Sequence, residues 1–273
     1  MATNVRKSGK KHRSRAHKVF VCLLIAVILV LITLVIIYIS GTRYLKVKTS
    51  DGYIRFFGKV DEFGSPASGT LYYSDGSEGK INVEESTIEY TDGTVYSGPL
   101  SNLKKSGKGT LTYSNGDKYE GMFEDDKMSG QGVFTFAGGN RYEGEFENGQ
   151  PSGKGTFTGY DGSVYVGEFK DGVKCGNGKY TWADGSVYEG EFANDVRNGS
   201  GTLTFANGDV YVGQFEDDAR TGIGTMNWKL SGDTYTGEFY NNLMNGYGKY
   251  TWATGRVYEG YFKNGIIVRI ENK

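Results

Sequence analysis

The sequence predicts an all-β repeat protein: an elongated, twisted antiparallel sheet of stacked hairpins, preceded by one transmembrane helix. Two observations lead to this fold class. Residues 141–163 have the sequence RYEGEFENGQPSGKGTFTGYDGS, and the pattern begins again 23 residues later as VYVGEFKDGVKCGNGKYTWADGS. A run of 22 uncharged residues, Val19 to Ser40, precedes the repeats. A period of this length indicates stacked supersecondary units.

The composition agrees with short strands joined by tight turns. The 273 residues include 43 Gly and 21 Tyr but only 3 Pro, without the three-residue period of collagen. The two cysteines, Cys22 and Cys175, provide no disulfide framework. We therefore expect packing and backbone hydrogen bonds to hold the fold.

Charge is distributed unevenly along the chain. Residues 1–40 hold seven of the 31 basic residues and none of the 32 acidic ones, which leaves residues 41–273 with a net charge of −8. Nucleic acids and anionic lipids bind clustered cations. We expect no nucleic-acid partner, and this charge disfavours lipid binding by the repeats.

The apolar run from Val19 to Ser40 predicts an uncleaved signal anchor. As a helix it extends about 33 Å, enough to cross the hydrocarbon core. A cleaved signal peptide is the competing interpretation, but its apolar region is shorter and ends in a small-x-small site, which residues 37–41 do not offer. The flanking basic residues predict a cytoplasmic N-terminus and an extracytoplasmic repeat domain. They are Arg6, Lys7, Lys10, Lys11, Arg13, Arg15 and Lys18.

Eight tyrosines set the register of the repeats. They are spaced by 23 residues, with one interval of 24, and each is followed two positions later by glycine. A Gly-x-Gly element recurs in phase with them. The tyrosines are Tyr96, Tyr119, Tyr142, Tyr165, Tyr188, Tyr211, Tyr235 and Tyr258.

Each repeat divides into two strands. Alternation places Tyr142, Gly144 and Phe146 on one face and Glu143 with Glu145 on the other. We expect Gly144 to leave a notch that a neighbouring ring fills. The second strand is predicted from Gly155, with the Gly-x-Gly as the turn before it. Asp-Gly and Asn-Gly pairs separate the units, and the extra residue within 228–232 enlarges one such turn.

Tyr-Glu-Gly-Glu-Phe, then Gly-x-Gly with an aromatic or aliphatic residue and Thr, then Asp/Asn-Gly, all at a period of 23 residues, resembles the MORN (membrane occupation and recognition nexus) repeat. The resemblance implies an elongated, grooved sheet that acts as a scaffold, a protein-binding surface or, in some members, a membrane-associated module. We expect a basic cytoplasmic tail (1–18), a signal anchor (19–40), a linker and divergent β cap (41–94), about eight repeats (95–265) and a closing strand (266–273).

The repeats offer no predicted catalytic or metal site. The two histidines, His12 and His17, precede the apolar run, which removes His-based triads and metal sites from the body. The pair Asp125-Asp126 fits turn chemistry better than calcium binding. A repeated acidic face is more often solvated surface than a glycosidase site. We therefore expect neither an enzyme nor a cofactor.

Two surfaces remain as candidate binding sites. The first is the candidate binding face, where the residues between Tyr and Phe vary: Glu143, Glu145, Val166, Glu168, Glu189, Glu191, Val212, Thr236, Glu238 and Tyr261. The second is an aromatic ladder that serves as core or as an exposed groove: Tyr142, Phe146, Tyr180, Trp182, Tyr188, Trp228 and Trp252.

The sequence thus favours a membrane-anchored, non-enzymatic scaffold that binds a protein partner along the sheet. The alternatives are binding of cell-envelope polysaccharide by exposed aromatic residues, and a lipid-binding membrane-tethering module.

Overall fold

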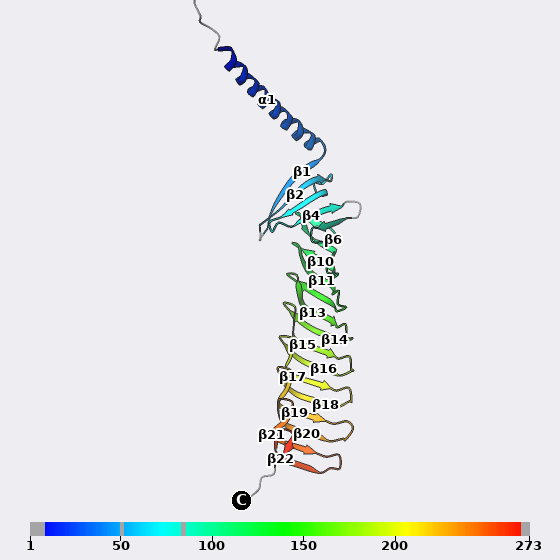
Figure 1. Ribbon diagram of the computed structural model, residues 1–273. Coiled ribbons are helices and arrows are strands. Elements are labelled where there is room, and N and C mark those ends of the chain that lie inside the picture. Colours follow the sequence, from blue (N-terminus) through cyan, green and yellow to red (C-terminus); the bar gives the residue numbers. More distant parts are fainter. Residues whose placement is uncertain (1–8, 50–51, 83–85, 269–273) are drawn as a thin grey trace, which may run out of the picture. The chain divides into compact units, whose positions relative to one another are not determined.

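The computed structural model describes residues 9–49, 52–82 and 86–268 (Figure 1). The chain forms two compact units, Met1–Asp92 (unit 1) and Gly93–Lys273 (unit 2).

In its described part, unit 1 combines a helix with a small antiparallel sheet. Consecutive strands pair with one another, and Phe56 and Leu71 are fully buried in its core. The elements are α1 (Gly9–Ile39), β1 (Thr42–Thr49), β2 (Gly52–Val60), β3 (Pro66–Tyr73), β4 (Glu78–Asn82) and β5 (Thr87–Tyr90).

Helix α1 contains the apolar run. Its segment Lys18–Ile39 has a mean hydropathy of 3.6 and none of it is buried. A helix satisfies its own backbone hydrogen bonds, which lipid requires. By length and composition this helix fits a membrane span or a signal sequence.

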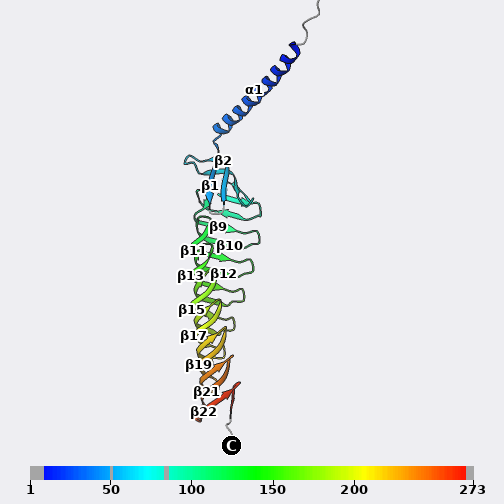
Figure 2. The same cartoon turned by 90° about the vertical axis from the view of Figure 1, so that its left-hand side faces the viewer.

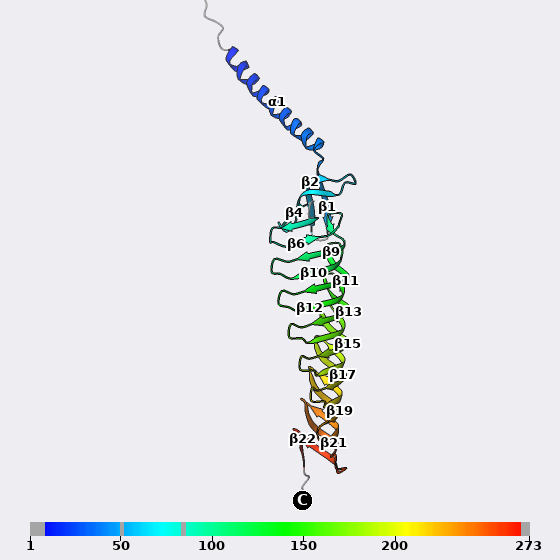
Figure 3. The ribbon, with the colours of Figure 1, turned by 90° about the vertical axis from the view of Figure 1, so that its right-hand side faces the viewer.

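Unit 2 is one antiparallel sheet of stacked hairpins, as predicted. Strand β6 pairs with β9, and from β9 to β23 each strand pairs with the next; Figures 2 and 3 show the strands following one another in chain order. Strands β7 and β8 form a small hairpin. The strands are β6 (Val95–Ser97), β7 (Leu100–Ser101), β8 (Lys104–Lys105), β9 (Gly107–Thr112), β10 (Lys118–Glu124), β11 (Lys127–Thr135), β12 (Arg141–Glu147), β13 (Gln150–Thr158), β14 (Val164–Lys170), β15 (Val173–Thr181), β16 (Val187–Ala193), β17 (Val196–Thr204), β18 (Val210–Glu216), β19 (Ala219–Asn227), β20 (Thr234–Tyr240), β21 (Leu243–Thr251), β22 (Val257–Lys263) and β23 (Ile266–Ile267).

Two-residue turns join the strands within each repeat. Asn148 and Gly149 have φ of 52° and 90°, and Asp125 and Asp126 have φ of 48° and 71°. Positive φ at both positions is the type I′ geometry that suits the twist of a hairpin, and Asn, Asp and Gly tolerate it best. The Asp pair is therefore part of a turn.

The Gly-x-Gly element was predicted as a turn, and this prediction is wrong. Gly153 and Gly155 lie inside β13, because the turn falls earlier, at Asn148–Gly149. Gly153 has a φ of 69°, and the register between β12 and β13 shifts between Gly144 and Phe146. The element supplies the flexible backbone of a β-bulge.

The Asp-Gly and Asn-Gly pairs that separate the repeats, such as Asp161-Gly162, lie in wider loops. The loop from Gly159 to Ser163 is closed by a hydrogen bond from the amide of Gly159 to the carbonyl of Ser163 at 2.8 Å. In the loop from Trp228 to Asp233 the equivalent bond spans one more residue. The extra residue therefore enlarges a turn, as predicted.

Candidate functional site

The sheet of unit 2 has two faces with different residues. We call the side that carries Tyr142, Gly144 and Phe146 the inner face, and the side that carries Glu143 and Glu145 the outer face. On β12 these residues alternate between buried and exposed.

The inner face holds the core of the array. Tyr142 and Tyr188 are at most 1% exposed and Phe146 is 4% exposed. The ring of Tyr142 covers Gly144 and its cross-strand partner Gly155, so that a Cβ at either position would overlap the ring or the facing backbone. The notch predicted at Gly144 is therefore present and filled.

The core tyrosines also share a pattern of one hydrogen bond and edge-on ring contacts, which Tyr142 illustrates. The hydroxyl of Tyr142 donates to the carbonyl of Glu145 at 2.9 Å. The ring meets those of Phe146 and Phe169 edge-on, with centroids 5.1 and 4.9 Å apart. The Tyr–Phe contact recurs between successive repeats up to Tyr235 and Phe262, so rings link each repeat to the next.

Burial raises the pKa of these hydroxyls. The pKa values of Tyr119, Tyr142, Tyr188, Tyr211 and Tyr235 are raised from 10.0 to about 12, in each case chiefly because burial disfavours the phenolate. Burial likewise raises the pKa of the Cys175 thiol. The thiol is therefore less reactive than an ordinary cysteine.

Four glutamates of the candidate binding face support the fold. Each accepts a hydrogen bond from an amide inside the bulge of the following strand: Glu145 from Lys154 at 3.4 Å, Glu168 from Asn177 at 3.1 Å, Glu191 from Ser200 at 2.9 Å and Glu238 from Tyr247 at 2.9 Å. These carboxylates stabilise the backbone of the Gly-x-Gly element.

The remaining residues of the candidate face show no common partner. Glu143 pairs with Arg141 and Glu189 with Lys179, each at 2.7 Å. Val166 and Val212 are about half exposed. The hydroxyl of Thr236 lies 3.0 Å from that of Thr225, and Tyr261 meets Tyr247 edge-on.

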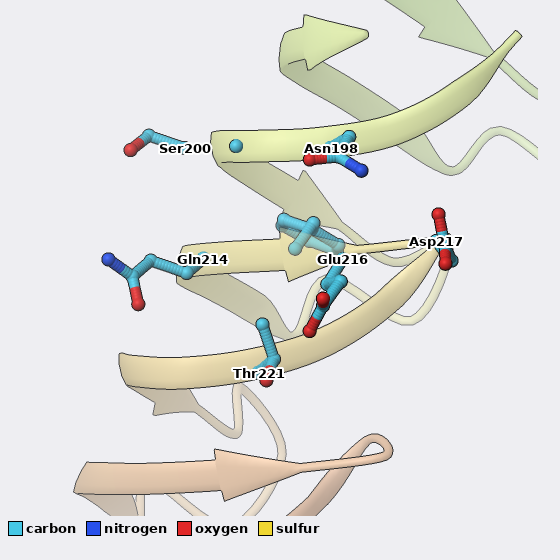
Figure 4. Close-up of a pocket in the computed structure, with 8 residues that line it drawn as sticks. Asn198, Ser200, Gln214, Glu216, Asp217 and Thr221 are labelled. Carbon is cyan, nitrogen blue, oxygen red and sulfur yellow. The ribbon is translucent and has the colours of Figure 1, made fainter. Parts of the chain in front are cut away.

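Two shallow hollows lie on the outer face. One of about 550 Å³ is lined by Glu143, Glu145, Lys154, Val166 and Glu168 among others. The second, of about 330 Å³, is shown in Figure 4, where Asn198, Glu216 and Thr221 come from the neighbouring strands β17, β18 and β19. Both are open, and the second is lined mainly by polar atoms.

The other aromatic residues of the ladder form a half-buried row along the edge of the inner face. Tyr180 contacts Trp182 with centroids 4.7 Å apart. Tyr250 contacts both Trp228 and Trp252, at 5.5 and 4.8 Å. The structure thus separates the predicted ladder into a buried core (Tyr142, Phe146, Tyr188) and a half-buried row (Tyr180, Trp182, Trp228, Trp252).

A contact between repeats was missed by the sequence interpretation. In each repeat, the second residue after the tight turn (Arg197, for example) lies beside the second residue of the tight turn in the next repeat (Asp218). Arg197 donates through Nε to Asp218 Oδ1 and through Nη2 to the Asp218 carbonyl, both at 2.8 Å. The pairing at a spacing of 21 residues, as in Lys174 with Asp195, is the pattern that could have revealed it.

The predicted membrane-flanking residues fall at the start of the chain. Arg6 and Lys7 lie outside the described residues. Lys10, Lys11, Arg13 and Arg15 lie within α1, and Lys18 is exposed at the start of the apolar segment. Within the described residues, no cluster of three or more metal-ligating side chains is found.

Comparison with known proteins identifies the repeat. A family model described as the MORN repeat matches residues 104–118, 119–141, 142–164, 165–187, 188–210, 211–229 and 235–255. No curated protein matches the chain. A solved structure of the SAS-4 (dCPAP) TCP domain of Drosophila melanogaster, in complex with a proline-rich motif of Ana2 (dSTIL), is similar with 11% identity and a TM-score of 0.37. That match covers 57% of this chain and 85% of the other.

Proposed function

The chain belongs to the MORN-repeat family, and from this premise we propose that unit 2 is a non-enzymatic scaffold whose inner face docks a polypeptide partner. The observation that carries the proposal is the half-buried aromatic row. Trp182, Trp228 and Trp252 occupy the same loop position in their repeats and each keeps part of its side chain open to solvent. A row of partly exposed aromatic residues is the kind of surface that proteins use for binding.

Basic residues flank this row. The guanidinium of Arg197 lies 5.4 Å from the ring of Trp182, and that of Arg256 lies 4.2 Å from the ring of Trp252. Combined aromatic and guanidinium groups suit a polypeptide with apolar and acidic side chains. Repetition along the array adds weak contacts into useful affinity.

Site-specific photocrosslinking tests this proposal. A benzophenone side chain at Trp182 or Trp228 should give discrete protein adducts in cells, whereas one at Val212 on the outer face should not. Adducts from Val212 alone would overturn the assignment to the inner face.

Binding of cell-envelope polysaccharide is the second candidate, favoured by the same tryptophans. Sugars stack on open ring faces, but Arg256 already covers one face of Trp252. Trp182→Ala and Trp228→Ala variants that stay folded but lose glycan retention would favour the sugar. Retention equal to that of the unchanged protein would exclude it.

We further propose that α1 is an uncleaved anchor with a cytoplasmic N-terminus and that the array (residues 95–265) is extracytoplasmic. The acid-free tail before the apolar segment supports this orientation. Protease added to intact cells should remove unit 2. An array that survives on cells but is cleaved after lysis would reverse the orientation.

A further inference from the structure

The contact between repeats that Arg197 and Asp218 illustrate follows a rule of charge. Where the second residue after the turn is basic, the second turn residue of the next repeat is acidic: Lys105 with Asp126, Lys174 with Asp195, and Arg197 with Asp218. Where the second residue after the turn is neutral, the second turn residue of the next repeat is glycine: Met128 with Gly149, Pro151 with Gly172, and Met244 with Gly265. Each charge is thus compensated or absent.

Arg220 departs from this rule. Its partner is Asn242, which accepts from Nε at 3.4 Å through Oδ1 and from Nη2 at 2.8 Å through the backbone carbonyl. The geometry copies that of Arg197 and Asp218, but the carboxylate is replaced by a neutral amide. No carboxylate forms an ion pair with Arg220 in the part of the chain that the structure describes.

The guanidinium of Arg220 is otherwise surrounded by a thioether and aromatic rings. Nη1 has a thioether partner, the sulfur of Met226 at 3.7 Å, which is a weak acceptor. The guanidinium lies 5.5 to 5.8 Å from the rings of Phe205, Tyr211 and Phe239. Burial lowers the pKa of Arg220, as expected for a cation that has lost water without gaining an anion.

A hollow on the inner face opens beside this cation. It has a volume of about 290 Å³, and its walls include Arg220, Met226, Trp228, Phe239 and Met244. Asp209 also lines the hollow, where its Oδ1 accepts from the amide of Lys229 and its Oδ2 from the side-chain amide of Asn207, both at 2.9 Å. The hollow therefore combines a cation without an ion pair among the described residues, a carboxylate that is already hydrogen-bonded, and apolar walls.

We propose that this hollow binds an aspartate or glutamate side chain of the partner polypeptide, with Arg220 supplying the charge and Met226, Trp228 and Met244 receiving the flanking apolar residue. Asn242 already occupies the place that Asp218 takes beside Arg197, so the acid binds the remaining N–H groups of Nη1 and Nη2. A guanidinium binds a carboxylate through two parallel hydrogen bonds, and a half-buried site strengthens them. The assignment rests on the proposed docking of a polypeptide on the inner face.

The methionines provide a direct readout. Of the five in the chain, Met226 and Met244 line the hollow, whereas Met122 and Met128 lie two or more repeats away. The full-length protein, labelled with ¹³C at its methionine methyl groups and held in nanodiscs, is titrated with the peptide acetyl-Gly-Leu-Glu-Leu-Gly-amide. A second titration uses its Gln counterpart.

We expect the Glu peptide to shift the Met226 and Met244 signals saturably and to leave Met122 and Met128 unchanged. The Gln peptide should bind at least about tenfold more weakly, because a charge-assisted hydrogen bond exceeds a neutral one by that order. Asn242→Asp should weaken the Glu peptide at least about tenfold, because it places a competing carboxylate on Arg220 without removing the cation.

Two further variants control the experiment. Arg220→Met removes the cation and gives this repeat the neutral residue found at Met128 and Met244. It should also abolish the shifts that the Glu peptide causes at Met226 and Met244. Asp218→Asn makes the reverse change one repeat away, beside Arg197, and should leave the affinity at Met226 and Met244 unchanged. Unshifted Met122 and Met128 signals show that each variant remains folded.

Equal affinity of the Glu and Gln peptides, or unchanged binding by Asn242→Asp, would overturn the inference. So would the absence of shifts at Met226 and Met244. If photocrosslinks from Trp182 and Trp228 persisted in that case, docking on the inner face would stand and only the acid site would fall.

Discussion

On the inner face of unit 2, tyrosine, glycine and phenylalanine recur in each repeat from Tyr119 onward, whereas on the outer face the residue after the tyrosine changes from Glu143 to Val166, Glu189 and Val212. The buried ring of Tyr142 needs two glycines beneath it and a phenylalanine at its edge. The outer residues that directly follow the tyrosines face water and each other, so the backbone tolerates many types there. This difference separates what the fold requires from what is free for recognition.

The largest expected effect is on the inner face at alkaline pH. The core tyrosines have a pKa of about 12 in the folded array, against 10.0 when exposed. Because the folded pKa is the higher one, stability is fully present below pH 10 and is lost as the pH rises toward 12. Circular dichroism and phenolate absorbance should therefore change together. Tyrosines that ionise near pH 10 with the sheet intact would contradict this.

A substitution at one glycine should come next. Gly155→Val places a side chain against the ring of Tyr142 and should cost about 3 kcal/mol or more in the free energy of unfolding. Gly138→Ala is the control, since its Cβ meets no atom within 4 Å. Thermal unfolding of both variants measures the difference, and equal melting temperatures would show that the ring does not fix these glycines.

The contact between repeats predicts a smaller effect with a rescue. Asp218→Gly leaves the half-buried Arg197 without its carboxylate and should cost about 1 kcal/mol. The double variant Arg197→Met with Asp218→Gly reproduces the neutral pair Met128 and Gly149, so it should recover most of that loss. Denaturant titration measures both. A double variant that is less stable than the single one would reject the charge rule.

Much of this fold could be predicted from the sequence, because its periodicity shows which residues lie on the inner face. The alternation around Tyr142 fixed the buried side, and Gly144 marked the close approach of a ring. The Gly-x-Gly prediction failed for a physical reason: glycine serves turns and bulges alike, and Asn148-Gly149 had the stronger turn chemistry. The partners of Glu191 and Arg197 could not be predicted, because they depend on which residues the bulge and the stacking bring together.

The outer face provides the smallest and most selective test. Glu191 accepts a hydrogen bond from the amide of Ser200 at 2.9 Å, while Glu189, two residues earlier, has only an exposed ion pair with Lys179. Glu191→Ala should cost about 0.5–1 kcal/mol, because it leaves a bulge amide to water. Glu189→Ala should cost less than about 0.5 kcal/mol, as exposed ion pairs contribute little. Chemical denaturation measures the free energy of unfolding of both variants. Because each loses one negative charge, a difference between them reflects the local contacts and not the net charge. If Glu189→Ala were the more harmful, the outer positions beside the tyrosines would belong to the fold, and their variation could no longer be attributed to recognition.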